Sequence, residues 1–507
     1  MALPRFARNT LHSTIAGAST AVGAFLSVVL IARMLGPGGA GNVALGVWLV
    51  GTLVTICDLG LPLTIARFIP DLSAHERTDD VAQFAPSFFP ALLATTAMGA
   101  ACLLFVWEFR APQLGWLSFL PFEDQAAAIW LALAFLFVIQ AIGNYGLAQL
   151  RGRQEFERAA RLSAISFLMQ LAGVVLGGLS HGVPGALVGY GGGSALLALH
   201  ALTHIRIGGL VDRELRARAW RFSLASWGVG LIAAIVWSRT ELLFLNHFRG
   251  AREAGLYAAA NTLALVATQA PLLMTGGLLA LFAERHAVGD HAGLDRAYES
   301  AVRFMSFLIF PACFGMAAIA PSLVPALFGA SFAEAAAPAA LLVAMQAFGA
   351  VSAVSSALLF ATERNYLLVW TGMIGAVATI AAGLSIIPAY GLMGAVVTRS
   401  VIQFSIVGAS FIYIDRVLRC PTPYASVVRI MAAATGCWLA ARSVVATVEG
   451  PSGIAPAIAA GAIVYVLLAR MLRALPDDDI GRLRVVVGRL PSWLAPVVMP
   501  LVQFFER

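Results

Sequence analysis

The stretch I-A-R-M-L-G-P-G-G-A-G-N, residues 31–42, separates two apolar runs, and the second run leads into C-D-L-G-L-P-L-T-I-A-R-F-I-P-D at residues 57–71. Glycine supplies the backbone angles of a sharp reversal at little steric cost, and proline presets one of those angles. Each apolar run is long enough to cross a hydrocarbon core of about 30 Å as a helix. We therefore predict two membrane-spanning helices joined by a tight glycine-rich turn.

The same pattern returns in the middle of the chain as R-G-A-R-E-A-G-L-Y-A-A-A-N, residues 249–261. Gly36 matches Gly250 and Gly41 matches Gly255, both at the same separation along the chain. Fixed separations of this kind are typical of an internally repeated architecture. We therefore predict that the chain is a doubled unit.

A second pair of similar stretches supports the doubling. G-G-L-S-H-G-V-P-G-A-L-V-G at 177–189 resembles L-S-I-I-P-A-Y-G-L-M-G-A-V-V at 384–397, and Gly185 matches Gly394 at nearly the separation of the first pair. Six predicted spans lie in each half, so the copies share one orientation and are related by an axis along the membrane normal. Two such bundles can enclose a cavity and rock about it, which is typical of transporters; an inert scaffold is the alternative.

Composition indicates a polytopic helical membrane protein. Of the 507 residues, 60% are hydrophobic and only 12% are charged, whereas soluble domains carry about 25% charged residues. We predict fourteen spans, at 11–35, 42–64, 82–107, 126–149, 161–180, 183–204, 222–247, 255–283, 299–320, 335–361, 366–387, 391–414, 426–447 and 454–475.

The distribution of arginine predicts the orientation. All 33 basic residues are arginine, and 26 of them fall in inner loops if the N-terminus is inside. An excess of positive charge marks cytoplasmic loops, so we expect both termini in the cytoplasm. Membrane topology thus explains the net charge of +7, and no nucleic-acid partner is expected.

These features divide the chain into four predicted segments. They are an N-terminal six-helix lobe at 1–210, a C-terminal six-helix lobe at 211–415, an extra pair of membrane helices at 416–475 and a cytoplasmic amphipathic tail at 476–507. The tail contains R-L-R-V-V-V-G-R-L-P-S-W-L and is typical of a segment that lies on a membrane surface. The acidic run D-D-D at its start is interpreted as a solvated helix start rather than as the metal motif of a sugar transferase.

Charged residues inside spans are the candidate functional residues, because a charge at mid-membrane costs at least about 2.5 kcal/mol. Arg239 and Glu241, in W-S-R-T-E-L-L-F-L, are the clearest pair. They are two positions apart and therefore point to different faces of a helix. Each can bind a ligand, or each can form an internal ion pair with another helix.

Three further charges have two interpretations each. Asp58 can bind a proton or cation, or can cap a local helix break before Gly60. Arg67 can mark the inner membrane face or can contact a phosphate. Arg399, in T-R-S-V-I-Q, can face a cavity or a neighbouring helix. The five cysteines show no paired or metal-type spacing, so neither a disulfide nor a metal site is expected.

Taken together, I-A-R-M-L-G-P-G-G-A-G, C-D-L-G-L-P, R-E-A-G-L-Y-A-A-A and G-L-M-G-A-V-V resemble the bacterial polysaccharide-flippase family. That family belongs to the multidrug/oligosaccharidyl-lipid/polysaccharide exporter superfamily. The resemblance implies two six-helix lobes around a central cavity in the bacterial inner membrane. It also implies that undecaprenyl-diphosphate-linked oligosaccharide repeat units move from the inner to the outer leaflet, for capsule, O-antigen or exopolysaccharide assembly.

The resemblance also suggests roles for the charged residues. Arg67, Arg239 and Arg399 are the positions that can hold the diphosphate, and Asp58 and Glu241 are those that can couple transport to an H+ or Na+ gradient. No enzyme activity and no cofactor are expected. The implied partners are the lipid-linked oligosaccharide, membrane lipids, and the glycosyltransferases and polymerase of the same pathway.

Two other functions compete with this interpretation. A cation-coupled multidrug exporter of the same superfamily usually has twelve spans, so the predicted extra pair argues against it. A membrane polysaccharide polymerase or ligase needs a large outer loop with arginines, and no such loop is predicted.

Overall fold

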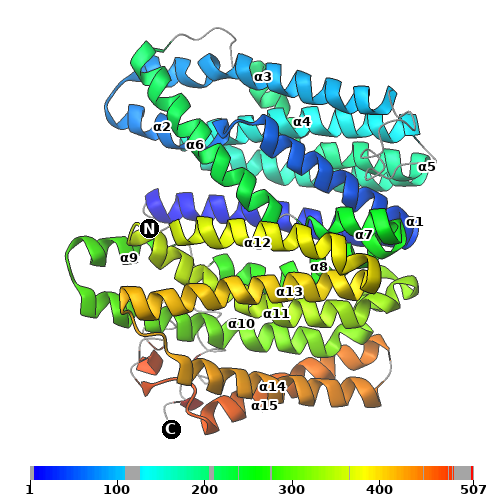
Figure 1. Ribbon diagram of the computed structural model, residues 1–507, viewed down its shortest axis with the longest axis vertical. Coiled ribbons are helices and arrows are strands. Elements are labelled where there is room, and N and C mark those ends of the chain that lie inside the picture. Colours follow the sequence, from blue (N-terminus) through cyan, green and yellow to red (C-terminus); the bar gives the residue numbers. More distant parts are fainter. Residues whose placement is uncertain are drawn as a thin grey trace. The chain divides into compact units, whose positions relative to one another are not determined.

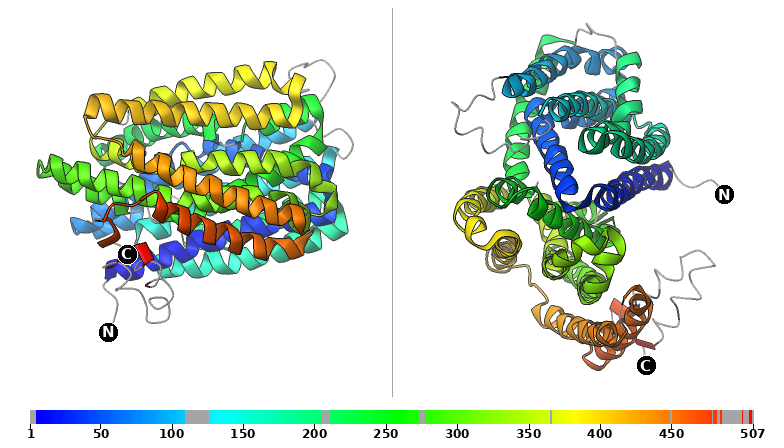
Figure 2. Two further views of the ribbon diagram at one scale, coloured as in Figure 1. Left: turned by 90° about the horizontal axis from the view of Figure 1, so that it is seen from below. Right: turned by 90° about the vertical axis from the view of Figure 1, so that its right-hand side faces the viewer.

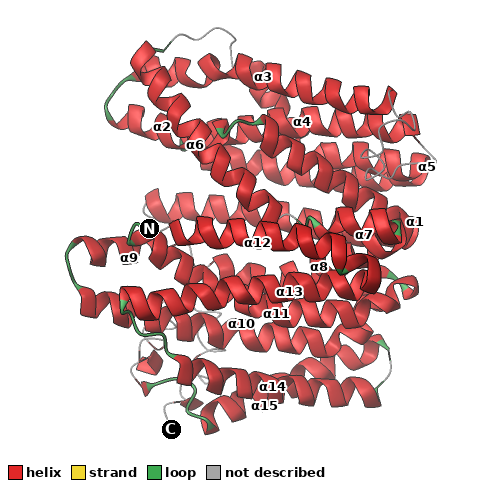
Figure 3. Cartoon of the chain, in the orientation of Figure 1, coloured by secondary structure: helices red, strands yellow, loops and turns green. Residues whose placement is uncertain are grey.

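The computed structural model describes residues 5–108, 126–204, 211–237, 239–273, 277–364, 366–448, 450–477, 479–481, 484, 499 and 504–505. Over these residues the secondary structure is helical and contains no strand (Figure 3). Among these residues, ten helices are long and apolar enough to cross a membrane. The chain is therefore an all-helical multi-pass membrane protein. Most of the predicted basic tail motif, 482–494, lies outside the described residues.

Figure 1 labels the main helices. In chain order they are α1 Arg5–Cys57, α2 Leu61–Ala74, α3 Thr78–Glu108, α4 Ala126–Gly152, α5 Phe156–His204, α6 Arg213–Trp237, α7 Glu241–Arg249, α8 Ala251–Leu273, α9 Leu278–Ala287, α10 His291–Phe328, α11 Ala336–Ala361, α12 Tyr366–Ser385, α13 Ile387–Tyr413, α14 Tyr424–Thr447 and α15 Ile454–Met471.

The two longest helices are hairpins that turn at a glycine. Gly36 interrupts α1 with φ 65°. Figure 1 shows that α1 reverses direction along its length. Gly182 interrupts α5 with φ 60°, and on either side of it Gly177 and Gly185 meet backbone to backbone. α5 thus covers two predicted spans, whereas α1 covers the first span and most of the second, 42–64, which is interrupted at residues 58–60. The total of fourteen spans stays a prediction, because α6 to α9 are not among the ten apolar helices.

The matched glycines of the two sequence repeats share their backbone conformation. Gly36 and its match Gly250 have φ 65° and 87°. Gly182 and Gly391, which stand at the same separation as Gly185 and Gly394, have φ 60° and 53°. Residues other than glycine rarely adopt a positive φ of this size, which explains why glycine occupies all four turns.

The helices form two compact units, one of residues 1–259 with 372–398 and the other of 260–371 with 399–507. In the first unit, aromatic side chains of α2, α3 and α6 pack together, among them Phe68, Phe84, Phe88 and Trp220. In the second unit, α14 and α15 lie side by side and pack against α10 (Figure 2). The lobe boundaries drawn from the sequence repeat stay a prediction.

Candidate functional site

A break between α1 and α2 carries the first of the predicted site residues, Asp58. α1 ends at Cys57 and α2 begins at Leu61, with Leu59 and Gly60 between them at φ 52° and 72°. The half-buried Asp58 accepts the Gly60 N–H on Oδ1 at 2.8 Å. Of the two interpretations of Asp58, the structure thus supports the capping of a local break, and the same carboxylate keeps a second oxygen for other partners.

Side chains of α6 complete this break. The Trp227 Nε1–H donates to the carbonyls of Thr55 and Ile56, each at 3.0 Å, and the Ser223 hydroxyl donates to the Leu59 carbonyl at 2.7 Å. A helix end inside a bilayer leaves carbonyls that cost several kcal/mol each without a partner. These two side chains therefore stabilise a helix interruption that is unfavourable in isolation.

The approach of α6 to the break depends on the glycine within it. A Cβ atom at Gly60 would lie 2.4 Å from the Ser223 carbonyl oxygen, which is closer than real Cβ contacts. On the other side of the break, the Thr95 hydroxyl of α3 donates to the Cys57 carbonyl at 2.6 Å. α1, α2, α3 and α6 thus meet at one irregular point of the backbone.

A second break, between α6 and α7, carries Arg239 and Glu241. Arg239 has φ 64°, which is unfavourable for a long side chain and persists only where the surroundings impose it. Glu241 begins α7, is 2% exposed and accepts the Tyr257 hydroxyl at 3.2 Å. The half-buried Arg239 is near enough to Tyr190 for the two to interact electrostatically. The structure therefore brings both predicted residues to a helix start, where the backbone dipole favours the acid.

Arg67 lies on α2, one to two turns beyond the first break. Its side chain is exposed, and its guanidinium lies 4.2 Å from the centre of the Phe222 ring of α6. Among the described residues it has neither a hydrogen bond nor a carboxylate partner. Arg67 is thus oriented by an aromatic ring and retains its donors for an anion.

Arg399 belongs to the second unit, unlike the other four predicted residues. It is half-buried on α13, one turn before Gln403. Gln403 donates from Nε2 to Gln346 Oε1 of α11 at 3.3 Å, and Gly349 leaves room for its amide. The structure therefore gathers Asp58, Arg67, Arg239 and Glu241 in the first unit and leaves Arg399 in the other.

Sequence reasoning missed three polar residues of this region. Ser223 and Trp227 are four positions apart on α6, a spacing that places both on one helix face and that could have been recognised in the sequence. Asn246 of α7 is 3% exposed, and its amide has no hydrogen-bond partner among the described residues. A buried amide of this kind costs about 1–3 kcal/mol unless it is paired, so Asn246 joins the candidate ligand-binding residues.

The described residues contain no group of three or more His, Cys, Asp or Glu side chains that could hold a metal ion. All five cysteines are free thiols, and four of them are buried. The polar chemistry of the site consequently rests on guanidinium, carboxylate and amide groups and on the backbone of the two helix breaks.

Comparison with known proteins identifies related sequences and folds. The family model described as polysaccharide biosynthesis protein matches residues 30–337. The succinoglycan biosynthesis transport protein ExoT of Rhizobium meliloti (strain 1021) is 26% identical over 396 residues, which cover 76% of this chain and 74% of that protein.

Two solved structures describe the fold. The lipid II flippase MurJ in an inward closed conformation has a TM-score of 0.69 at 13% identity, covering 90% of this chain and 98% of that one. An inward-facing multidrug resistance MATE family transporter of the MOP superfamily has a TM-score of 0.64 at 15% identity, covering 78% and 93%. At these identities the similarity shows a shared fold.

Proposed function

Because the chain belongs to the polysaccharide biosynthesis protein family, we propose that it carries undecaprenyl-diphosphate-linked oligosaccharide repeat units across the bacterial inner membrane, from the inner to the outer leaflet. Membership confirms the resemblance that the motifs indicated. The named relatives are a transport protein, a flippase and a transporter, in agreement with the prediction that the chain is not an enzyme.

The observation that supports this function best is the pair of helix breaks at residues 58–60 and 239–240. Irregular backbone at membrane depth is tolerated only where it is buried in protein or lines a water-filled cavity. Discontinuous helices of this kind form the binding sites of many transporters, with helix ends directed at charged substrates and ions. Both breaks carry predicted site residues, Asp58 at one and Arg239 with Glu241 at the other.

The proposed architecture has fourteen spans, with six-helix lobes at 1–210 and 211–415, an additional pair at 416–475 and both termini in the cytoplasm. The cavity between the lobes opens first inward and then outward. A hydrated diphosphate cannot cross hydrocarbon unaided, since each uncompensated charge costs several kcal/mol or more. The lobes provide the polar route while the polyprenyl tail stays in the bilayer.

The charged residues divide into two proposed roles. Arg67, Arg239 and Arg399 bind the diphosphate, because a guanidinium pairs with phosphate oxygens through two parallel hydrogen bonds. Asp58 and Glu241 take up and release the H+ or Na+ that drives the cycle. The free donors of Arg67 and the buried Glu241–Tyr257 contact support this division.

The test is a deletion of the gene in its native host. Surface polysaccharide should be lost, and lipid-linked repeat units should accumulate facing the cytoplasm, where glycosyltransferases complete them. Units that reach the outer leaflet and remain unpolymerised would contradict the proposal and indicate a polymerase. A change in drug susceptibility with normal surface polysaccharide would indicate the multidrug exporter instead.

A further inference from the structure

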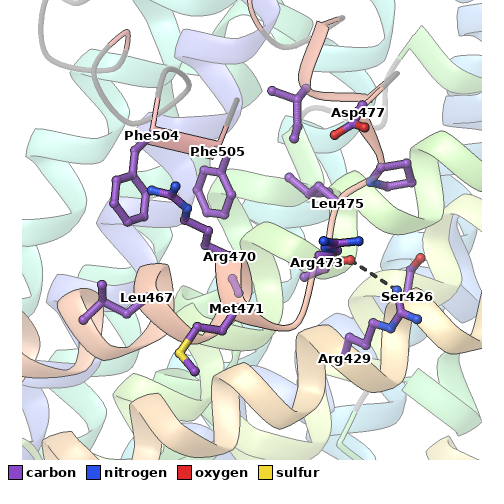
Figure 4. A pocket seen from close by; sticks show the side chains of 14 residues that line it. Ser426, Arg429, Leu467, Arg470, Met471, Arg473, Leu475, Asp477, Phe504 and Phe505 are labelled. Atoms are coloured by element: carbon purple, nitrogen blue, oxygen red, sulfur yellow. Dashed lines mark hydrogen bonds between the residues drawn. The ribbon is translucent and has the colours of Figure 1, made fainter. Parts of the chain in front are cut away.

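A cavity in the second unit is lined by arginines that the transport mechanism does not use. It has a volume of about 910 Å³ and lies where α14 begins and α15 ends (Figure 4). Arg429 of α14, Arg470 at the end of α15 and Arg473 just beyond it line the cavity. The lining residues include one carboxylate, Asp477. The site thus carries an excess of positive charge.

Two of the three guanidiniums contact groups other than carboxylates. Arg470 lies 4.2 Å from the centre of the Phe504 ring, and Arg429 donates from Nη1 to the Arg473 carbonyl at 3.4 Å. Within the described part of the chain, no carboxylate lies within 4 Å of any of these three guanidiniums. Three like charges around one cavity repel one another, and a bound anion relieves that repulsion.

The wall of this cavity is fixed by an acidic residue that was predicted to be solvated. Asp479 is buried and accepts hydrogen bonds from Arg303 Nε at 2.6 Å and Ser300 Oγ at 2.8 Å, both on α10. The interpretation of D-D-D as a solvated helix start is therefore wrong for Asp479, because its buried carboxylate pairs with Arg303, whose side chain is 12% exposed. Asp477 is exposed, as predicted. Anchoring at Asp479 holds the segment after α15 against α10.

The cavity is apolar on the side of α15. Leu467 and Met471 both line it, and their exposed fractions are 48% and 77%. One turn before Leu467, Ile463 is 61% exposed. A row of exposed apolar side chains that leads away from a cluster of arginines matches an amphiphile, with a charged head and a hydrocarbon chain, better than a soluble anion.

We propose that this cavity binds the phosphate group of a membrane lipid. Arg429, Arg470 and Arg473 hold the phosphate oxygens, and the lipid chain lies along Leu467 and Met471. Basic pockets between membrane helices recognise lipid head groups in this way. The phosphate can belong to an anionic phospholipid or to a polyprenyl diphosphate. The proposal rests on the cavity alone and holds whichever substrate the protein transports.

The test measures lipid binding to the purified full-length protein. Native mass spectrometry would follow cardiolipin, phosphatidylglycerol and undecaprenyl diphosphate, with phosphatidylcholine as the neutral lipid. Arg429→Gln combined with Arg473→Gln should weaken lipid binding about 25-fold, because each arginine near a membrane surface contributes about five-fold to the affinity for an anionic lipid. Arg442→Gln, which removes a charge from the same helix outside the cavity, should leave binding unchanged.

A charge-conserving variant and the lipid preference separate lipid binding from a folding defect and identify the lipid. Arg473→Lys keeps the charge and should lose only part of the affinity, which separates phosphate binding from a folding defect. A preference for cardiolipin or for undecaprenyl diphosphate would identify the source of the phosphate, and either supports the proposal. Equal binding by wild type and the double variant would overturn it. Competition by inorganic phosphate as strong as that by lipid would also overturn it, since the apolar side would then contribute nothing.

Discussion

The second half of α1 and the start of α8 meet through glycines that match in the sequence repeat. A Cβ atom at Gly41 would lie 1.8 Å from the Ala251 carbonyl oxygen, and one at Gly255 would lie 1.9 Å from the Pro37 oxygen. Pro37 and Ala251 also match each other in the repeat, so the two halves of the contact are equivalent. Small residues allow backbones to approach this closely in membranes.

Gly41→Ala should separate the two helices. Ordinary van der Waals contact begins at 3.4 Å, so the Cβ and the Ala251 oxygen must move apart by about 1.6 Å. Overpacking of this kind typically costs about 1–3 kcal/mol, which exceeds the gain of up to about 1 kcal/mol in helix propensity. If the contact exists in only one conformation of a transport cycle, the population of that conformation should fall by up to about 150-fold relative to the others.

Thermal unfolding in detergent measures the effect, with Gly51→Ala as the matched control. Gly51 lies on the same helix, and an added Cβ there meets no atom within 4 Å. The control should therefore match or exceed wild-type stability. Gly41→Ala and Gly255→Ala should each lower stability, and the double variant should lose less than the sum, because both disturb one contact. Wild-type stability of Gly41→Ala would refute the close approach.

Three other predictions concern topology, substrate and the first helix break. In a cysteine-free background, the thiol of Arg216→Cys should react in intact cells only with membrane-permeant thiol reagents. The thiol of Gly39→Cys should also react with impermeant reagents. The reverse pattern at both positions would contradict the topology. Arg239→Lys should keep partial export, because charge survives while the bidentate geometry is lost, whereas Arg239→Ala should abolish it; normal export by an inserted alanine variant would exclude this residue. Ser223→Ala should destabilise the protein by about 1–3 kcal/mol, because a carbonyl of the break loses its donor. Ser180→Ala, at an exposed site bonded within its own helix, is the control, and an equal loss in both would contradict the argument.

The sequence predicted the helical fold and its turns because those depend on local chemistry. Runs of apolar residues and turn glycines act where they stand, so the reversals at Gly36 and Gly182 were recognisable without a structure. The completion of the first break was not, because the donors come from Trp227 and Ser223, on a helix that follows much later in the chain. Asp58 could be interpreted either as a titrating group or as a cap for the same reason.

The charge at the first helix break is not repeated in the second copy. α8 ends at Leu273 and α9 begins at Leu278, close to the positions that match the end of α1 and the start of α2 in the repeat. Leu272 nevertheless takes the place that Asp58 has in the first copy.

The charges at the break between α6 and α7 likewise have no match in the first copy. Arg239 and Glu241 in the second copy match Phe25 and Ser27 in the first, and Ser27 is a buried side chain that accepts a hydrogen bond from Gln170 Nε2 at 2.9 Å. Each copy therefore contributes charges that its partner copy lacks. Two copies with the same charges would offer two equivalent sites, whereas the proposed substrate has a single diphosphate. Charges that are not shared between the copies suit one asymmetric head group carried by a doubled scaffold. Arg239, rather than any residue common to both copies, is therefore the position at which we expect the proposed function to be most sensitive to substitution.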